Sequence, residues 1–481
     1  MSSVKEDTIH SMKWSTIERF IVQGAYFVIG IIMARQLNPS DYGTVGVLGI
    51  FLGVSQTFID SGFGNALIRK LDRTEVDFST VFYFNLAVSI ICYLVLFISA
   101  PYIASFFEIT ILCPIVRVQS LTLVFGALMG IHMTKLLIDL NFKAIAQRTI
   151  LATIISGAVG IVCAYSGLGV WSLVIQNLTN VLTSVIFILL YVRWKPLLVF
   201  SKKSFCELFS FGSKLLASGL INTLFGNLNT LVIGKFFSAK DLGYYSRGTN
   251  FAQMPVSTIN SILGKITYPI FSKIQNDNER LISVYRKYVC IMSIPIFFGC
   301  CLLASIGKPL ILFLLTDKWS ESIIYLQIFV FCIMFDHIQS INLNLLIVKG
   351  RSDLFLKLEI IKKTISIIIL FASIPFGVLG ICVSKILYSQ IALAINTYYT
   401  GKLFNLGYLK QWGDFSIYFI ISIICCIPGF IISQYVPIHP ILSLCIGLTL
   451  GSILYYLMLR NNPFMKEILS TVKSGIKTFL H

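Results

Sequence analysis

Six basic side chains lie inside long apolar stretches of the sequence: Arg19, Arg117, Lys214, Arg247, Lys265 and Lys385. A charge near the centre of a bilayer costs about 2.5 to 3.5 kcal/mol even on a lenient insertion scale, so each should face a hydrated cavity or an opposite charge. The acids in such stretches are fewer, namely Glu18, Asp60 and Asp336. This excess of positive charge indicates a site for an anion.

Helical spacing places several of these cations beside uncharged polar side chains. Steps of three, four or seven residues put three polar stripes on the faces of three expected helices: Arg247, Asn250, Ser257, Ser261 and Lys265; Lys214, Ser218, Asn222 and Asn229; and Asp336, Gln339 and Ser340. Cations surrounded by amides and hydroxyls suit a ligand that combines phosphate with many hydroxyl groups. The predicted substrate-binding residues are Arg117, Arg247, Lys214, Lys265, Asn222 and Asn250.

Each cation also has a structural interpretation. Arg19 and Lys214 lie about one turn from the predicted inner ends of their helices, from which long basic side chains reach the headgroups. Arg117 and Arg247 lie deeper, where an ion pair or a helix cap is the alternative to a cavity role. Sequence alone leaves both interpretations open.

Three residues are candidates for coupling transport to an H⁺ or Na⁺ gradient: Asp60, Asp336 and His337. Asp60 stands beside Gly62 and Gly64, so it either binds a cation or caps a helix break at those glycines. Asp336 and His337 are adjacent, and they form either a proton relay or ordinary hydrogen bonds with neighbouring helices.

Composition determines the broad class. Hydrophobic residues make up 56% of the 481 and charged residues 12%, and the mean hydropathy is +0.84. These values are typical of a polytopic membrane protein. Most of the 12 cysteines fall within expected spans, where they serve as small packing residues, and no Cys/His spacing matches a metal site. We therefore expect no metal. Separately, the first fourteen residues do not resemble a cleavable signal peptide.

About fourteen spans are expected from apolar segments of about twenty residues. The loops on one side carry 27 Lys and Arg and those on the other carry 5. Because positively charged loops stay in the cytoplasm, both termini should be cytoplasmic, in a bacterial inner membrane. This asymmetry accounts for most of the net charge of +17, so lipid headgroups explain it and no nucleic-acid partner is expected.

A repeated hairpin divides the chain. Residues 34–43, ARQLNPSDYG, return 200 positions later as residues 234–243, GKFFSAKDLG, with Asp and Gly in register. Six spans separate the copies, so both lie on the outer face and the repeat is parallel. Arg35 and Lys235 each end a helix, where they should cap its C-terminus.

The expected fold is all-α, with about fourteen transmembrane helices in two parallel-repeat six-helix lobes plus two C-terminal helices. The expected parts are an N-terminal lobe (1–200), a C-terminal lobe (201–405), an appended pair of spans (406–460) and an amphipathic cytoplasmic tail (461–481).

Several segments resemble the polysaccharide flippases of the Wzx type, in the superfamily that also contains the multidrug and toxin extruders and the lipid II flippase. They are IMARQLNPSDYGTVGVLGIFLGVSQTFIDSGFGNALIRK, VFYFNLAVS, GLGVWSLV, RWKP and LGYYSRGTNFAQMP. The resemblance implies a two-lobed exporter that moves undecaprenyl-diphosphate-linked oligosaccharide from the cytoplasmic to the periplasmic leaflet. It implies cationic cavity residues that hold the diphosphate or acidic sugars, for which Arg117, Arg247, Lys214 and Lys265 are the candidates. Membrane lipids and polysaccharide polymerase machinery are the other partners implied.

Three other functions are the alternatives to this one. A multidrug cation antiporter of the same superfamily should have carboxylates in its pocket, whereas this chain has more intramembrane cations. A membrane polysaccharide polymerase or ligase normally needs a sizeable outer loop, and the longest here, residues 307–322, is short. A noncatalytic scaffold does not account for buried charge. No GxxxxGK[ST] motif is present, so we expect no ATP-driven step and no enzyme activity in this chain.

Overall fold

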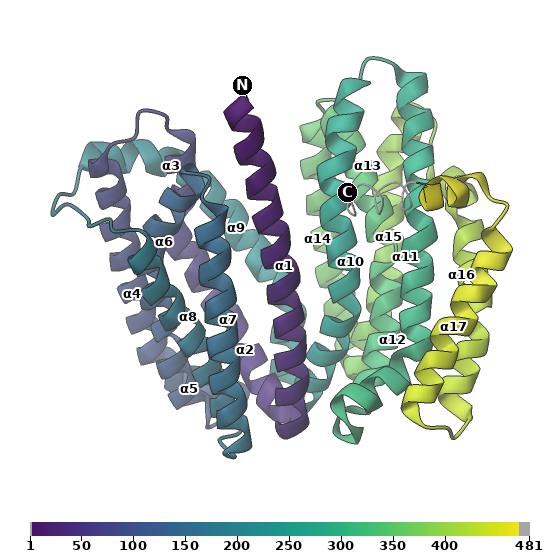
Figure 1. Ribbon diagram of the computed structural model, residues 1–481, viewed down its shortest axis with the longest axis horizontal. Coiled ribbons are helices and arrows are strands. Elements are labelled where there is room, and N and C mark those ends of the chain that lie inside the picture. Colours follow the sequence, from purple (N-terminus) through teal and green to yellow (C-terminus); the bar gives the residue numbers. More distant parts are fainter. Residues whose placement is uncertain (1, 471–481) are drawn as a thin grey trace. The chain divides into compact units, whose positions relative to one another are not determined.

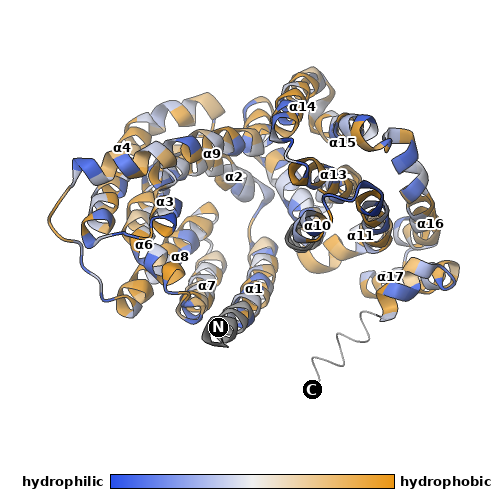
Figure 2. Cartoon of the chain, turned by 90° about the horizontal axis from the view of Figure 1, so that it is seen from above, coloured by the Kyte–Doolittle hydropathy of each residue, from blue (hydrophilic) through white to orange (hydrophobic). Residues whose placement is uncertain are grey.

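The computed structural model describes residues 2–470, with the side chains of residues 2–12 and 257–266 not included. Every regular element in this part of the chain is helical (Figure 1). Hydrophobic residues cover most helical turns, and hydrophilic ones concentrate near the connecting loops (Figure 2). The tail is helical over residues 463–470, and the rest of the expected amphipathic tail lies outside the described residues.

The helices of the first half follow one another with short connections. They are α1 (Ser2–Gln36), α2 (Pro39–Asp60), α3 (Phe63–Arg69), α4 (Glu75–Phe107), α5 (Leu112–Gln119), α6 (Leu121–Ile138), α7 (Phe142–Tyr165), α8 (Val170–Tyr191) and α9 (Lys202–Phe236).

The helices of the second half are also joined by short connections. It contains α10 (Ala239–Lys273), α11 (Asn278–Leu315), η1 (Asp317–Trp319), α12 (Ser322–Ile333), α13 (Asp336–Val348), α14 (Ser352–Ser373), η2 (Ile374–Phe376), α15 (Gly377–Phe404), α16 (Tyr408–Tyr435) and α17 (Pro440–Leu459).

Twelve segments of the described chain are long and apolar enough to cross a membrane, where the sequence predicted about fourteen. One of the twelve, Ser352–Phe404, contains two helices, α14 and α15, which are separated by η2, and α15 begins at Gly377 with φ of 76°. The other difference is α10, whose polar side chains and two prolines interrupt its apolar runs. The all-α polytopic class is thus confirmed.

Two of the expected spans are broken inside the apolar region by local backbone geometry. Between α2 and α3, Ser61 has φ of 39° and Gly62 has φ of 71°, both in the left-handed region. Between α12 and α13 the chain turns at Met334 and Phe335, so Asp336 becomes the first residue of α13. A carboxylate there is favoured by the unpaired N–H groups of the helix start.

The repeated hairpins have the same local structure. The carboxylate of Asp41 accepts a hydrogen bond from the N–H of Asn38 at 2.9 Å, and Asp241 accepts one from the N–H of Ser238 at 3.2 Å. Each aspartate therefore caps the start of the following helix, which explains its position in the motif. Lys235 donates instead to the backbone oxygen of Phe106 at the end of α4, at 2.7 Å.

The chain forms two compact units, Met1–Gly243 and Tyr244–His481. Helix α9 packs in the first unit, because Leu208 joins a core cluster with Phe63, Leu67 and Phe82 from α3 and α4. The repeat in the sequence instead begins the second lobe at residue 201. The two divisions differ because one follows packing and the other follows sequence similarity.

Candidate substrate and coupling sites

A polar stripe runs along the exposed face of α9. Lys214, Ser218 and Asn222 are spaced four residues apart and are all exposed in the first unit, as the sequence predicted for one face of a helix. The segment Lys202–Phe236 that carries them is one of the twelve candidate spans. A charged and amide-bearing face inside a span is stable where water or another polar surface covers it.

The opposite face of α9 is held against α2 by small residues. Thr57 and Thr223 share a hydrogen bond between their hydroxyls at 3.0 Å. A Cβ on Gly219 would lie 2.9 Å from Thr57 Cγ2, and one on Gly53 would lie 3.2 Å from Thr223 Cγ2. This close packing fixes which face of α9 carries the polar stripe.

In the second unit, α10 carries Arg247 and Asn250. The Arg247 guanidinium lies over the ring of Trp319 in η1, 5.8 Å from its centroid, and Asn250 is exposed. Gly248 allows this contact, since a Cβ there would lie 2.6 Å from the backbone oxygen of Ser322. The side chain of Lys265, also predicted for this stripe, lies outside the described side chains.

Arg117 contacts α4 in the structure. Its Nε donates to the backbone oxygen of Phe97 at 3.4 Å, and its guanidinium lies 4.5 Å from the centroid of the Phe97 ring. Pro101 has no N–H, so the oxygen four residues earlier, that of Phe97, lacks its helical partner. These contacts support the structural interpretation of Arg117 and do not bring it to Lys214 and Asn222.

A second group of charges surrounds the start of α13. Asp336 interacts electrostatically with Lys362 of α14 and Lys385 of α15. Lys385 donates to the hydroxyl of Tyr245 on α10 at 2.6 Å, and lies over the ring of Phe329 at 4.9 Å. Four helices of the second unit thus meet at one charged cluster, which we call the Asp336 cluster: Asp336, Glu359, Lys362, Lys385 and Tyr245.

Three members of this cluster, Glu359, Lys362 and Tyr245, were not predicted from the sequence. Because α14 begins at Ser352, Lys362 lies in its third turn, where it is buried and paired with Glu359 at 2.5 Å. The spacing of three residues between Glu359 and Lys362, inside an amphipathic stretch, is the sequence feature that could have indicated this helical ion pair.

His337 does not extend the cluster toward a relay. Its Nδ1 lies 2.8 Å from the backbone oxygen of Met334, and its Nε2 lies 3.0 Å from the hydroxyl of Ser293 on α11. The carbonyl requires the proton on Nδ1, which leaves Nε2 to accept from Ser293. Both ring nitrogens therefore join helices together, and this favours the hydrogen-bonding interpretation.

Asp60 is the last residue of α2 and is exposed. It accepts a hydrogen bond from Gln56 Nε2 at 2.9 Å, one turn earlier on the same helix. The expected helix break follows it directly at Ser61 and Gly62. Asp60 thus stands at a break in a span, with its carboxylate on the accessible side of α2.

A buried amide network joins four helices of the second unit near the start of α16. Gln411 donates to Asn342 Oδ1 at 3.0 Å and accepts from Tyr285 at 2.8 Å, while Thr400 also donates to Asn342 Oδ1 at 3.0 Å. All four side chains are at most 1% exposed. Their polar groups satisfy one another, so the network fixes the ends of α11, α13, α15 and α16.

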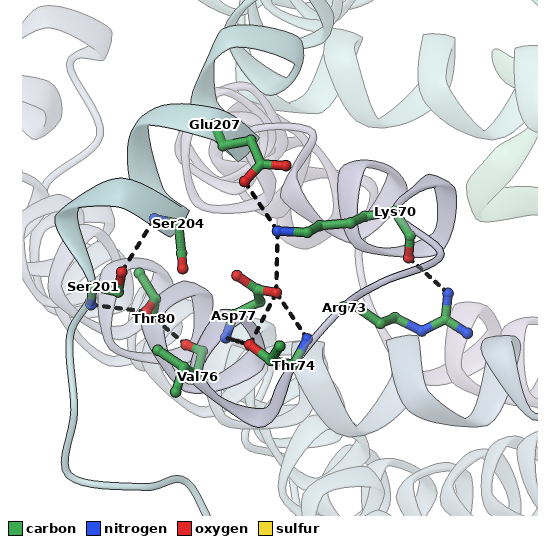
Figure 3. A network of polar contacts seen from close by, with 9 residues as sticks. All are labelled: Lys70, Arg73, Thr74, Val76, Asp77, Thr80, Ser201, Ser204 and Glu207. Carbon is green, nitrogen blue, oxygen red and sulfur yellow. Dashed lines mark hydrogen bonds and ion pairs between the residues drawn. The ribbon is translucent and has the colours of Figure 1, made fainter.

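An ion-pair clasp ties α9 to the α3–α4 loop (Figure 3). Lys70 Nζ lies 3.0 Å from Glu207 Oε2 of α9 and 3.3 Å from Asp77 Oδ2, and Asp77 also accepts from the N–H of Thr74 at 2.8 Å. The hydrogen bond to Glu207 raises the pKa of Lys70 above its ordinary value of 10.5, despite partial desolvation. A raised lysine pKa stabilises the fold at every pH below 10.5 and loses its effect only above it. Lys70 therefore keeps its charge near neutral pH.

No group of three or more His, Cys, Asp or Glu side chains within the described part of the chain is placed to hold a metal ion. This finding does not test the expectation that the protein holds no metal. What the arrangement offers chemically is a set of cations, amides and hydroxyls for recognition, together with one charged cluster that includes an acid.

Comparison with known proteins connects this arrangement to a family. A family model described as "Polysaccharide biosynthesis protein" matches residues 32–324, more than half of the chain. The teichuronic acid biosynthesis protein TuaB of Bacillus subtilis is 24% identical over 359 residues, which cover 74% of each protein. The lipopolysaccharide biosynthesis protein WzxC of Escherichia coli is 26% identical over 390 residues, which cover 79% of this chain and 76% of that protein.

The fold has a solved counterpart. A structure of the lipid II flippase MurJ in an inward closed conformation superposes with a TM-score of 0.71, covering 94% of this chain and 99% of that one at 13% identity. Identity at this level supports the fold alone. Together with the matched family model, these findings show that the chain belongs to the polysaccharide biosynthesis protein family, in the Wzx-type transporter group that its sequence resembles.

Proposed function

We propose that this chain is a flippase for lipid-linked oligosaccharides in cell-surface polysaccharide biosynthesis. It carries undecaprenyl-diphosphate-linked repeat units from the cytoplasmic to the periplasmic leaflet of the inner membrane by alternating access. The observation that carries the proposal is the exposed stripe of Lys214, Ser218 and Asn222 within a candidate span. Such a face matches a ligand with a charged phosphate and a hydrated sugar.

The proposed topology has fourteen spans in two six-helix lobes, followed by α16 and α17. It counts α10 as a span and α14 and α15 as two. Both termini are cytoplasmic because the basic loops lie on one side. We also propose that Arg247 and Asn250 of α10, together with Lys265 by helical spacing, are substrate-binding residues of the second unit.

Net flux requires an energy source outside the chain's own chemistry. Within the Asp336 cluster, two ammonium groups accompany the carboxylates of Asp336 and Glu359. We propose that protonation of Asp336 alters this balance and couples transport to an H⁺ gradient. Polymerase machinery that consumes the product on the outer face is the second proposed drive.

The test replaces the stripe on α9. Lys214→Ala combined with Asn222→Ala should lower surface polysaccharide and cause lipid-linked precursor to accumulate, with normal amounts of protein in the membrane. Lys202→Ala is the matched control, because Lys202 is exposed on the same helix outside the stripe. Wild-type export by the double variant would remove the stripe from the substrate path.

Arg247→Ala provides a second test from the other unit. It should impair export while the protein inserts in normal amount, since the guanidinium is the charge that α10 offers beside Asn250. Full export by this variant would remove Arg247 from the proposed lining.

A further inference from the structure

The linker between α8 and α9 presents apolar side chains at the surface of the first unit. It comprises residues 192–201, VRWKPLLVFS. Leu197, Leu198, Val199 and Phe200 are all exposed, and Leu198 is 94% exposed. A contiguous run of exposed apolar side chains is unfavourable in water and is typical of a place that another surface or a lipid phase covers.

The backbone of this linker is fixed to the start of α4. The N–H of Leu197 donates to the hydroxyl of Ser79 at 2.9 Å. The N–H of Ser201 donates to the hydroxyl of Thr80 at 3.1 Å (Figure 3). Both hydroxyls belong to completely buried side chains. The apolar run therefore lies between two anchored positions, and its exposure belongs to a fixed conformation of the chain.

Aromatic side chains anchor the linker on either side of Leu198. Trp194 Nε1 donates to Glu75 Oε2 at 2.5 Å, and the indole ring lies edge to face with Phe82, 5.9 Å between centroids. On the other side, the ring of Phe200 lies 6.0 Å from that of Phe205 in the first turn of α9. The linker thus holds Leu198 outward between two anchored rings.

The ends of three candidate spans place this linker at one face of the membrane. The spans Val170–Tyr191 and Lys202–Phe236 are the two that it connects, and the span that begins at Glu75 is the one to which it is hydrogen-bonded. The linker therefore lies at the boundary between hydrocarbon and water. From this depth apolar side chains can enter the acyl chains while the backbone stays among the headgroups.

Basic side chains accompany the apolar run. Arg193 and Lys195 precede it and Lys203 follows it, and all three are exposed. The sequence contains no acid from residue 192 to residue 206. The nearby Lys70 and Lys135, by contrast, pair with glutamates. Exposed positive charge on both sides of an exposed apolar run is complementary to a layer of anionic lipid.

We propose that the α8–α9 linker is a docking surface for anionic phospholipid, with Leu198 and Val199 inserted among the acyl chains and the basic side chains at the headgroups. The proposed topology makes this the cytoplasmic leaflet, whose surface is negatively charged. This docking goes beyond the flippase function, because its ligand is the bilayer itself. It fixes the inner end of the first unit at the membrane surface, and anionic lipid should gather there in preference to zwitterionic lipid.

Brominated phospholipids test the docking, because they quench a fluorophore that touches their acyl chains. The probe is bimane attached at Leu198→Cys in the full chain. The protein is placed in nanodiscs of phosphatidylglycerol and phosphatidylcholine in equal amounts, with bromine on one lipid or on the other, and the signal from the native cysteines is subtracted. Both lipids should quench the probe, and brominated phosphatidylglycerol should do so several-fold more strongly.

Leu71→Cys is the matched control. Leu71 lies in the α3–α4 loop of the same unit and is 91% exposed, but its neighbours are Lys70 and Asp72, without an apolar run. Bimane at this position should be quenched little by either lipid. Quenching at position 198 no stronger than at position 71 would overturn the docking. If aqueous iodide also failed to quench the probe at position 198, a protein surface and not lipid would cover the linker.

The charges are tested by replacing Arg193, Lys195 and Lys203 together with glutamine in the Leu198→Cys protein. Quenching should persist, because the apolar run is intact, but the two brominated lipids should now quench equally. Equal quenching by the two lipids before the charges are removed would overturn the preference for anionic lipid. Polysaccharide export enters none of these measurements, so failure of the docking is distinguishable from failure of the flippase function.

Discussion

Arg117 compensates for Pro101. The proline deprives the Phe97 carbonyl of its helical hydrogen bond, and Arg117 Nε donates to that oxygen from the neighbouring helix at 3.4 Å. The same relationship recurs in the second unit, where Ser433 donates at 2.7 Å to the oxygen of Ser305, four residues before Pro309. Side chains from adjacent helices thus satisfy carbonyls that prolines expose.

The first prediction concerns this pair. Arg117→Leu should destabilise the protein by about 1 kcal/mol, the usual net contribution of one such hydrogen bond, and lower the melting temperature in detergent. In a Pro101→Ala background the same change should have a smaller effect, because the alanine N–H bonds the Phe97 oxygen. Equal losses in the two backgrounds would refute the compensation. A selective loss of export at unchanged stability would return Arg117 to the substrate path.

The second prediction compares the effect on stability of alanine at two neighbouring glycines, Gly62 and Gly64. Gly62 has φ of 71°, and its added Cβ would lie 2.8 Å from that of Leu215. Gly62→Ala should therefore cost about 1 to 3 kcal/mol of stability. Gly64→Ala should be nearly neutral, since its Cβ meets only Thr134 Oγ1 at 3.4 Å. Thermal melting of the two proteins checks this, and similar melting temperatures would show that the break does not require Gly62.

The third prediction concerns the amide network. Gln411→Leu leaves Asn342, Thr400 and Tyr285 without a shared buried partner, so it should cost about 1 to 3 kcal/mol. Lys410→Ala is its control, because Lys410 is exposed on the preceding position of the same helix. Unfolding in detergent should distinguish the two. A Gln411→Leu protein as stable as its control would show that the network contributes little.

The fourth prediction tests the Asp336 cluster. Asp336→Asn removes a negative charge beside Lys362 and Lys385, so it should lower both stability and export. Adding Lys385→Met restores the charge balance and should recover stability without recovering export, if the acid couples transport. Export restored together with stability would assign Asp336 a purely structural role.

Most of the fold could be predicted from the sequence because membrane helices are recognisable by the length and apolarity of their segments. The apolar segments around Tyr26, Ser89 and Leu182, for example, each form part of a single helix, namely α1, α4 and α8. The sequence is less informative about where helices begin, since the basic residues Lys362 and Arg148 lie within α14 and α7. Because a helix can extend beyond its apolar segment, a basic residue next to that segment can belong to the helix and not to the loop.

The sites were predictable only in part. Periodicity placed Lys214 and Asn222 on one exposed face, because that relation is local to α9. It did not find the partners of Arg117, His337 or Lys385, because Phe97, Ser293 and Tyr245 come from other helices. Likewise the repeat aligned Gly43 with Gly243 without indicating that each packs against the backbone of the other hairpin.

The flippase function is tested most directly by the leaflet in which lipid-linked oligosaccharide resides after the protein is depleted. Membrane vesicles of known orientation, treated with an impermeant glycan-modifying enzyme, report how much lies in each leaflet. Depletion should leave the precursor on the cytoplasmic side, and the Lys214→Ala/Asn222→Ala protein should fail to restore the outer pool while the Lys202→Ala protein restores it. An unchanged distribution between the leaflets after depletion would contradict the proposed function.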